Sequence, residues 1–367
     1  MKRTRIFLIF LFTLLTLTST IWLLADEQGL SSTTNGYIVE YPLLVPNAGP
    51  QSIVVQTAGP PATVWFTMPD ADAIGRLVVT NSTNFQFTTF DNGITANSAP
   101  HDLVYDAANG VIWFTQPGNA SLGRLVISTG NSTEIPLPGN HVPLNLDIAP
   151  NGRLYITSPS TNHLLSYNPA TPGFTLYPYG GTGGNPTHID ILNNNSIWVT
   201  SPATNQVAEI KPSTSTTFIK IPVQDFGISP YPPSGLTLDS SAPWITANIM
   251  NRIGRYAEGT LTFWRWYELL PANSGASAID YTTSGTFNYL WFVQTDLGRV
   301  GRMTLGAANN DLILYSAHAF STPASQPTDI IVDENGVAWI TGKGNNVIAQ
   351  WVSPYASYTN LPLVVKP

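Results

Sequence analysis

The sequence predicts an all-β fold, a seven-bladed β-propeller, from two observations. A phrase of the form Trp-Phe-Thr recurs seven times, with successive copies 42 to 48 residues apart. Each copy follows a short apolar segment that opens on or near a proline. Repeated units of this length, each supplying four short antiparallel strands, are typical of β-propellers, in which every unit is one blade.

The aromatic phrase is expected to be the second strand of each blade. Its copies read TVWFT, VIWFT, RLYIT, SIWVT, APWIT, YLWFV and VAWIT, with their aromatic residues at Trp65, Trp113, Tyr155, Trp198, Trp244, Trp291 and Trp339. Because these rings occupy one equivalent position in every unit, we expect them to pack between blades rather than to stack on a ligand.

The segment before each phrase is expected to be the first strand of its blade. These segments read GPQSIVV, APHDLVY, VPLNLDI, NPTHIDI, PPSGLTL, GASAIDY and QPTDIIV. Large apolar residues alternate in them with a period of two, which indicates a half-buried strand. Turn sequences such as DAANG (106–110) and DENG (333–336) separate the first and second strands. The two strands are therefore predicted to form a hairpin.

A third strand is expected in segments such as AIGRLVV and SLGRLVI, and a more variable fourth strand follows each of them. The third strand often contains a Gly-Arg pair, in which the glycine is expected to let a neighbouring backbone approach. The arginines of these pairs are Arg76, Arg124, Arg255 and Arg302.

Two segments could complete the last blade and close the ring, which removes exposed strand edges. They are YIVEYPLLV, from Tyr37, and the tail YASYTNLPLVVKP. We expect the first, because its Glu-Tyr-Pro resembles the ends of fourth strands elsewhere in the chain.

The amino-terminal end carries the pattern of an export signal. Three basic residues precede an uncharged, mostly apolar run from Ile6 to Ala25. A run of about 20 residues is also long enough to cross a bilayer. Residues 1–25 are therefore expected to be a signal peptide or an N-terminal membrane anchor, followed by a linker at 26–35, the propeller at 36–353 and a C-terminal tail at 354–367. The protein is expected to be secreted or to lie outside the cell membrane, with membrane contact only through residues 1–25 if they are not cleaved.

The composition excludes several classes of function. Only 10% of the residues are charged and the net charge is -7, so we expect no nucleic-acid partner. The chain has no cysteine, so its stability outside the cell must come from packing. It also lacks the Gly-x-Ser-x-Gly and His-Glu-x-x-His motifs of serine hydrolases and zinc proteases.

The combined pattern of a proline-led strand, an Asn-Gly turn, Trp-Phe-Thr and Ile-Gly-Arg resembles the streptogramin B lyase (virginiamycin B lyase) family of seven-bladed propellers. The likeness covers about residues 36 to 353 and is clearest at 63–77, 111–125 and 251–256. The resemblance implies a magnesium-dependent elimination that opens the lactone of a cyclic peptide antibiotic. It also implies catalytic histidines just after the proline of the first strand in adjacent blades, one of them in a Glu-x-His arrangement.

His101 directly follows Pro100, where the resemblance places such a histidine. Its companions differ, because Ala99 stands in place of the glutamate, and Gln51 and Leu144 occupy the equivalent positions of the two neighbouring units. An elimination needs a base and an acid or metal that stabilises the leaving oxygen. His101 alone cannot supply both.

Polar residues on the first strands are the candidate site, because the innermost strands of a propeller line its central channel. The catalytic candidates are His101 and His188, and the ligand-binding candidates are Asp102, Asn145, Asp147, Asp190, Asp280 and Asp329. Three consecutive units would place two histidines and three carboxylates on one arc of the channel. Such an arc could hold a divalent cation, Mg²⁺ being the one that the resemblance implies. The alternative is that these groups hydrogen-bond to the backbone or to channel water, as buried polar groups must.

Three functions are compatible with these features. The sequence favours a propeller that binds a small-molecule or protein ligand at the mouth of its channel without the full catalytic set of the family. The second is a metal-dependent carbon-oxygen lyase that opens a cyclic lactone with His101 and His188. The third is a structural envelope protein, if the loops 171–186 and 225–233 block the channel, with Trp264 and Trp266 exposed for an interface or packed on the outer strand.

Overall fold

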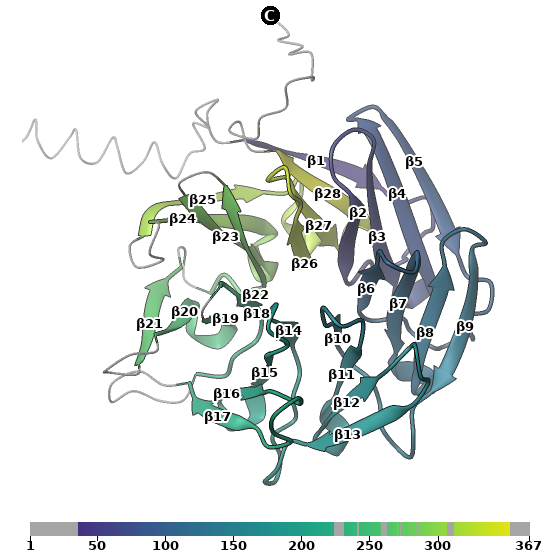
Figure 1. Ribbon diagram of the computed structural model, residues 1–367. Helices are drawn as coiled ribbons and strands as arrows, with labels where there is room; N and C mark the ends of the chain where they lie inside the picture. The colour runs from purple at the N-terminus through teal and green to yellow at the C-terminus, as the bar shows by residue number, and fades with distance from the viewer. Residues whose placement is uncertain are drawn as a thin grey trace, which may run out of the picture. The chain divides into compact units, whose positions relative to one another are not determined.

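Seven four-stranded antiparallel sheets form a closed ring around a central channel (Figure 1). The computed structural model describes residues 36–352, apart from residues 224–230, 241, 258–262, 270, 272, 285–286 and 307–311. The seven-bladed propeller predicted from the repeats is therefore confirmed. The predicted signal or anchor, the linker and the C-terminal tail lie outside the described residues. Within the described part, no helix has the length and apolar character needed to cross a membrane.

Each blade is one repeat unit, and its first strand is the innermost. Blade 1 contains β2 (Ile53–Thr57), β3 (Ala62–Met68), β4 (Ala73–Asn81) and β5 (Asn84–Phe90). Blade 2 contains β6 (Leu103–Asp106), β7 (Val111–Gln116), β8 (Ser121–Val126) and β9 (Asn131–Pro136). Blade 3 contains β10 (Leu146–Ile148), β11 (Leu154–Ser158), β12 (His163–Tyr167) and β13 (Phe174–Pro178). Blade 4 contains β14 (Ile189–Ile191), β15 (Ile197–Ser201), β16 (Gln206–Ile210) and β17 (Ile219–Pro222).

The remaining blades follow the same plan. Blade 5 contains β18 (Leu236–Leu238), β19 (Pro243–Ala247), β20 (Arg252–Ala257) and β21 (Phe263–Glu268). Blade 6 contains β22 (Ala276–Ser284), β23 (Phe287–Gln294), β24 (Arg299–Leu305) and β25 (Leu312–Ala319). Blade 7 contains β26 (Pro327–Val332), β27 (Ala338–Gly342), β28 (Val347–Val352) and β1 (Tyr37–Pro42).

Short 3-10 helices join the second strand of six blades to the third. They are η1 (Pro69–Ala71), η2 (Pro117–Asn119), η3 (Pro159–Thr161), η4 (Pro202–Thr204), η5 (Asn248–Met250) and η6 (Thr295–Leu297). A seventh, η7 (Pro323–Ser325), precedes β26. Proline suits the first position of such a turn, because its φ is fixed and the N–H that it lacks would have no helical partner there.

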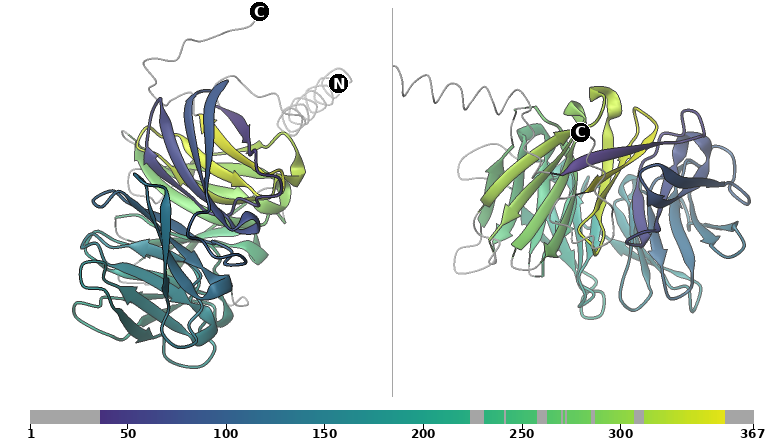
Figure 2. Two further views of the ribbon diagram at one scale, coloured as in Figure 1. Left: turned by 90° about the vertical axis from the view of Figure 1, so that its right-hand side faces the viewer. Right: turned by 90° about the horizontal axis from the view of Figure 1, so that it is seen from above.

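The amino-terminal strand closes the ring, as predicted. β1 pairs with β28 in antiparallel register from Tyr37 opposite Val352 to Pro42 opposite Val347. The Tyr41 hydroxyl donates to the Gln350 side chain at 2.8 Å across this pair. The two ends of the propeller thus lie side by side in one sheet, where purple β1 adjoins yellow β28 (Figure 2).

The aromatic residues of the second strands pack between blades, which confirms the interpretation of the repeat. Trp113 of blade 2 lies in one buried cluster with Leu146 and Ile156 of blade 3. Its indole N–H donates to Asp106 at 3.3 Å, and the guanidinium of Arg124 lies 5.6 Å from its ring centre. Comparable Arg-on-Trp contacts occur at Arg76, Arg255 and Arg302.

The glycine of the Gly-Arg pair has a different role from the one expected. A Cβ on Gly123 would overlap the ring of Phe114, and Gly75 and Gly301 meet Phe66 and Phe292 in the same way. The glycine therefore makes room for a ring of its own blade rather than for a neighbouring backbone.

We expect Trp113→Ala to lower the free energy of unfolding by roughly 3 to 5 kcal/mol, because it empties a fully packed site between two blades. Denaturant unfolding followed by circular dichroism measures the change. Leu44→Ala is the control, since Leu44 is 78% exposed and its truncation should change stability by less than about 0.5 kcal/mol. Equal effects of the two substitutions would contradict the packing role of Trp113.

Candidate functional site

In four blades, the threonine that ends the aromatic phrase joins the inner strand to the next blade. Thr115 accepts a hydrogen bond from the Asp102 N–H at 3.0 Å and donates to the Leu144 carbonyl of blade 3 at 2.7 Å. The same two bonds occur at Thr67, Thr246 and Thr341. This threonine is a functional position of the scaffold that the sequence analysis missed, although its recurrence in the phrase was visible.

The candidate aspartates form a second set of ties between blades. In each, the carboxyl group accepts from the N–H of the following residue and from an N–H of the next blade. Asp102 accepts from the N–H groups of Leu103 and Leu146 at 2.9 and 2.9 Å, and Asp190 from those of Ile191 and Leu238 at 2.7 and 2.8 Å. Asp280 accepts from the N–H groups of Tyr281 and Val332 at 2.8 and 2.7 Å, and Asp329 from those of Ile330 and Ile53 at 2.9 and 3.0 Å. Asp147 accepts similarly from Ile148 at 2.7 Å and from Ile191. The expected alternative role, hydrogen bonding to the backbone, is therefore present at all five.

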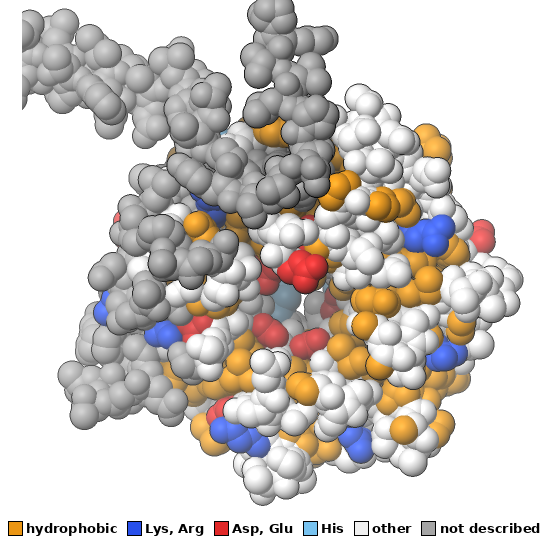
Figure 3. All heavy atoms as spheres, turned by 45° about the horizontal axis from the view of Figure 1, so that its top comes forward, with side chains coloured by type: hydrophobic (Ala, Val, Ile, Leu, Met, Phe, Trp, Pro, Cys, Tyr) orange, Lys and Arg blue, Asp and Glu red, His pale blue; other side chains and the backbone are white. Residues whose placement is uncertain are grey.

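The candidates occupy two levels of the channel. Asp102, Asn145, His188 and Asp329 lie two residues after the proline of their unit, and Asp147, Asp190 and Asp280 occupy the position two residues further along. His101 directly follows its proline, so it lies one residue before the first level. Residues two apart on a strand face the same side, so both levels face the channel. Figure 3 shows acidic side chains around the central opening, with a histidine inside it.

The carboxyl groups of the channel hold protons more tightly than ordinary aspartates. Burial raises the pKa of Asp190 and Asp329 to about 6 and that of Asp280 to about 7. Burial also raises the pKa of Asp102, and burial and the charge of Asp190 raise that of Asp147 well above its usual range. The backbone N–H donors act in the opposite direction, since they favour the ionised form.

Ser52 bridges two of these carboxyl groups across blade 1. Its hydroxyl oxygen lies 2.7 Å from Asp102 and 2.8 Å from Asp329. A hydroxyl has one hydrogen, so both contacts are full hydrogen bonds only when one of the two carboxyl groups is protonated and donates to the serine. The bridge therefore fits the raised pKa values, and Asn145 adds a further side-chain bond to Asp102.

The two candidate histidines are neutral and lie close enough to influence each other. Burial, and to a smaller extent the charge of His101, lowers the pKa of His188 to about 4. Burial lowers the pKa of His101 against the effect of its bond to the Leu144 carbonyl, and Lys343 lowers it further. The Nδ1 atoms of both rings are buried without a hydrogen-bond partner. Each ring therefore carries one nitrogen whose hydrogen-bonding capacity the described residues do not use.

A magnesium ion does not fit this set of residues. Mg²⁺ requires near-octahedral oxygen ligands at about 2.0 to 2.1 Å. The carboxylate oxygens of the channel are instead directed at backbone N–H groups of two blades. Among the residues that the structure describes, no three histidine, aspartate or glutamate side chains are grouped so that they could hold a metal ion.

Trp264 is not an exposed interface residue. It is 7% exposed, its indole N–H donates to the Pro222 carbonyl at 2.9 Å, and its ring stacks on Trp266. The packing alternative for these two residues is therefore the correct one. Of the two loops that could block the channel, residues 225–230 lie outside the described residues.

Comparison with known proteins bears on this geometry. A sequence model of the virginiamycin B lyase family matches residues 38–351. The chain belongs to this family. The resemblance found in the repeat motifs is thereby confirmed over almost the same range. No curated protein matches the chain.

Solved structures of the family share the fold. A streptogramin B lyase superposes with a TM-score of 0.72 at 23% identity, covering 88% of this chain and 99% of the other. Virginiamycin B lyase from Staphylococcus aureus gives a TM-score of 0.72 at 21% identity, covering 86% and 99%. A catalytically inactive histidine-to-alanine variant of the latter, with quinupristin, gives the same values. At these identities the likeness concerns the fold.

The raised carboxyl pKa values predict that stability falls between pH 6.5 and 8. Unfolded aspartate has a pKa of about 3.9, so in this range the folded chain holds protons that the unfolded chain has released. The free energy of unfolding then decreases as the pH rises through the folded pKa, which for Asp280 is about 7. His188 makes the free energy of unfolding increase with pH, chiefly between its folded pKa of about 4 and its unfolded pKa of about 6.5, which lies at or below the range tested.

Urea unfolding of the wild type and Asp280→Asn at the two pH values tests this. We expect the decrease from pH 6.5 to 8 to be smaller by about 1 kcal/mol in the variant, which lacks the titrating group. Asp91→Asn, at an exposed loop residue, makes the same change in charge and should leave the decrease as in the wild type. An unchanged decrease in Asp280→Asn would contradict the raised pKa.

Proposed function

We propose that this member of the virginiamycin B lyase family is an exported propeller that binds a ligand carrying a positively charged group in its central channel. The proposal rests on the charge of the channel. Five aspartates face it, and none forms an ion pair with lysine or arginine in the part of the chain that the structure describes. Above pH 7, where Asp190, Asp280 and Asp329 are mostly ionised, a channel lined by these carboxylates focuses its field and attracts ligands of the opposite sign.

The free histidine nitrogens add specificity to such a site. His101 and His188 are neutral near pH 7, so they do not oppose a cationic ligand. Each Nδ1 offers one hydrogen bond that the protein does not satisfy. Buried polar atoms normally have a partner, which supports a ligand at this place.

The proposal assigns no elimination to the channel. The glutamate and second histidine implied by the family motif are Ala99 and Leu144 or Gln51 here, and the channel carboxyl groups serve as ties between blades. Export is proposed from the pattern of residues 1–25 alone, with the propeller outside the membrane.

The second candidate function is a carbon-oxygen lyase that opens a cyclic lactone. Two observations favour it: family membership, and the place of His101 after Pro100 with His188 near it. In this version a neutral histidine takes the proton from the substrate, and a protonated carboxyl group of the channel supplies the acid.

Binding of putrescine to the full chain, measured calorimetrically, tests the proposed function. We expect saturable binding at pH 8 that weakens at pH 5, because protonation removes the negative charge from groups with pKa values of about 6 to 7. Asp280→Asn should weaken binding at pH 8, and Asp91→Asn should not. The uncharged analogue 1,4-butanediol should not bind. Binding that is independent of pH and of Asp280 would contradict a cation-selective channel.

Incubation of the full chain with quinupristin and Mg²⁺, followed by chromatography, separates the two functions. We expect no ring-opened product at high protein concentration. Product that is formed by the wild type and lost in His101→Ala would instead establish the lyase.

A further inference from the structure

Blade 3 lacks the set of three side chains that packs blades 2 and 5 onto the next blade. In blades 2 and 5 the tryptophan is surrounded by an aspartate that accepts its N–H and an arginine on its ring: Asp106, Trp113 and Arg124, and Asp239, Trp244 and Arg255. The equivalent residues of blade 3 are Ala149, Tyr155 and Ser166. All three members of the set are smaller there.

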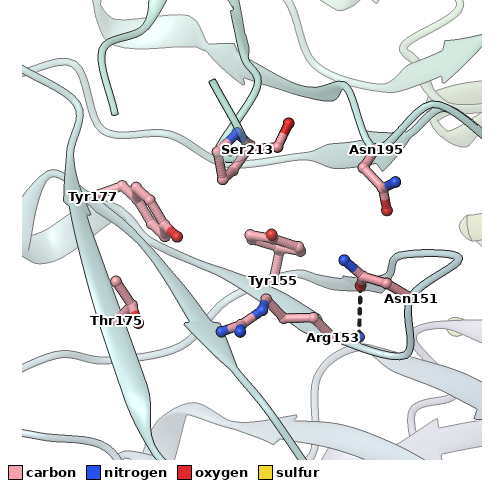
Figure 4. A pocket seen from close by; sticks show the side chains of 8 residues that line it. Asn151, Arg153, Tyr155, Thr175, Tyr177, Asn195 and Ser213 are labelled. Atoms are coloured by element: carbon pink, nitrogen blue, oxygen red, sulfur yellow. Dashed lines mark hydrogen bonds between the residues drawn. The ribbon is translucent and has the colours of Figure 1, made fainter. Parts of the chain in front are cut away.

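A cavity of about 270 Å³ occupies the space beside Tyr155. Its walls come from the β10–β11 connection, β11 and β13 of blade 3, and from two connections of blade 4. The lining residues are Asn151, Arg153, Tyr155, Thr175, Tyr177, Asn195, Pro212 and Ser213. In Figure 4, Arg153 and Tyr155 lie between Thr175 and Tyr177 on one side and Asn151 and Asn195 on the other.

This cavity is separate from the channel mouth near His101. His101 precedes β6, at the end of the ring where the proline-led loops lie. Asn151 and Asn195 lie in the turns that follow β10 and β14, at the opposite end of the inner strands. The cavity therefore opens between blades, on the other face of the ring.

The cavity contains a cation without a carboxylate partner. Arg153 donates to the Ser166 hydroxyl at 3.3 Å, and no ion pair to it occurs among the described residues. A guanidinium group offers a planar pair of donors that matches a carboxylate. Burial raises the pKa of the Tyr155 phenol to about 12, so this group stays a neutral donor. Asn195 contributes a buried Oδ1 without a hydrogen-bond partner, which can accept from a ligand hydroxyl.

We propose that this cavity is a second binding site, which takes a small organic acid that carries a hydroxyl group. Arg153 binds the carboxylate, the rings of Tyr155 and Tyr177 flank the body of the molecule, and Asn195 accepts from its hydroxyl. The volume equals that of about nine water molecules, which suits a compound the size of a hydroxybenzoate. The proposal is independent of the channel and of any elimination there.

Calorimetric titration of the full chain with 4-hydroxybenzoate tests the site. We expect saturable binding, with a dissociation constant raised at least about tenfold in Arg153→Gln, which loses the charged bonds to the carboxylate. Tyr155→Trp should abolish binding, because it places in blade 3 the larger ring found at this position in the other six blades. Arg124→Gln is the matched control, since Arg124 lies over Trp113 and does not line the cavity, and it should bind as the wild type does.

Two other probes test the chemical class. Benzoate, which lacks the hydroxyl, should bind more weakly than 4-hydroxybenzoate, and inorganic phosphate more weakly still. Failure of 4-hydroxybenzoate to bind, binding unaffected by both blade 3 variants, or tighter binding of phosphate would each overturn the proposal. Unfolding curves of the variants show whether a loss of binding accompanies a loss of fold.

Discussion

The structure depends on hydrogen bonds that cross from each inner strand to the next blade. The blades share no strand ladder with one another, so side chains provide most of the contacts between their sheets. Threonine hydroxyls such as that of Thr115 and carboxyl groups such as that of Asp102 each reach two blades at once. Outside these ties, the tryptophans fill the space between sheets. The polar inner ring and the apolar outer layer together fix the width of the channel.

The same ties give the channel its chemistry. A carboxyl group that bonds to backbone N–H groups must face the axis, where other carboxyl groups are close and water is restricted. Its pKa rises in consequence, as at Asp280 and Asp190. The same set of side chains therefore joins the blades and sets the electrostatic field of the channel. This also explains why the aspartates are poor magnesium ligands, since their oxygens are already directed at the backbone.

Blade 3 illustrates how a repeat protein can gain a site by losing a packing residue. The cavity lies beside Tyr155, where the large ring, its carboxylate partner and the arginine that covers it are all replaced by smaller residues. Arg153 lines this space from the connection that precedes β11. The other six blades have a tryptophan at the position of Tyr155.

The sequence by itself determined the number of blades, the four strands of each, the closing strand from Tyr37 and the family. These depend on local patterns that repeat seven times, so each copy supports the others. Only the tertiary structure decided what the inner aspartates bind, why glycine precedes arginine at Gly123, and that Trp264 is buried. Such features depend on which atoms of a neighbouring strand or blade come within hydrogen-bond or van der Waals distance. The sequence shows that Tyr155 stands where the other six units have tryptophan. The cavity beside it could be found only from the positions of residues in two blades.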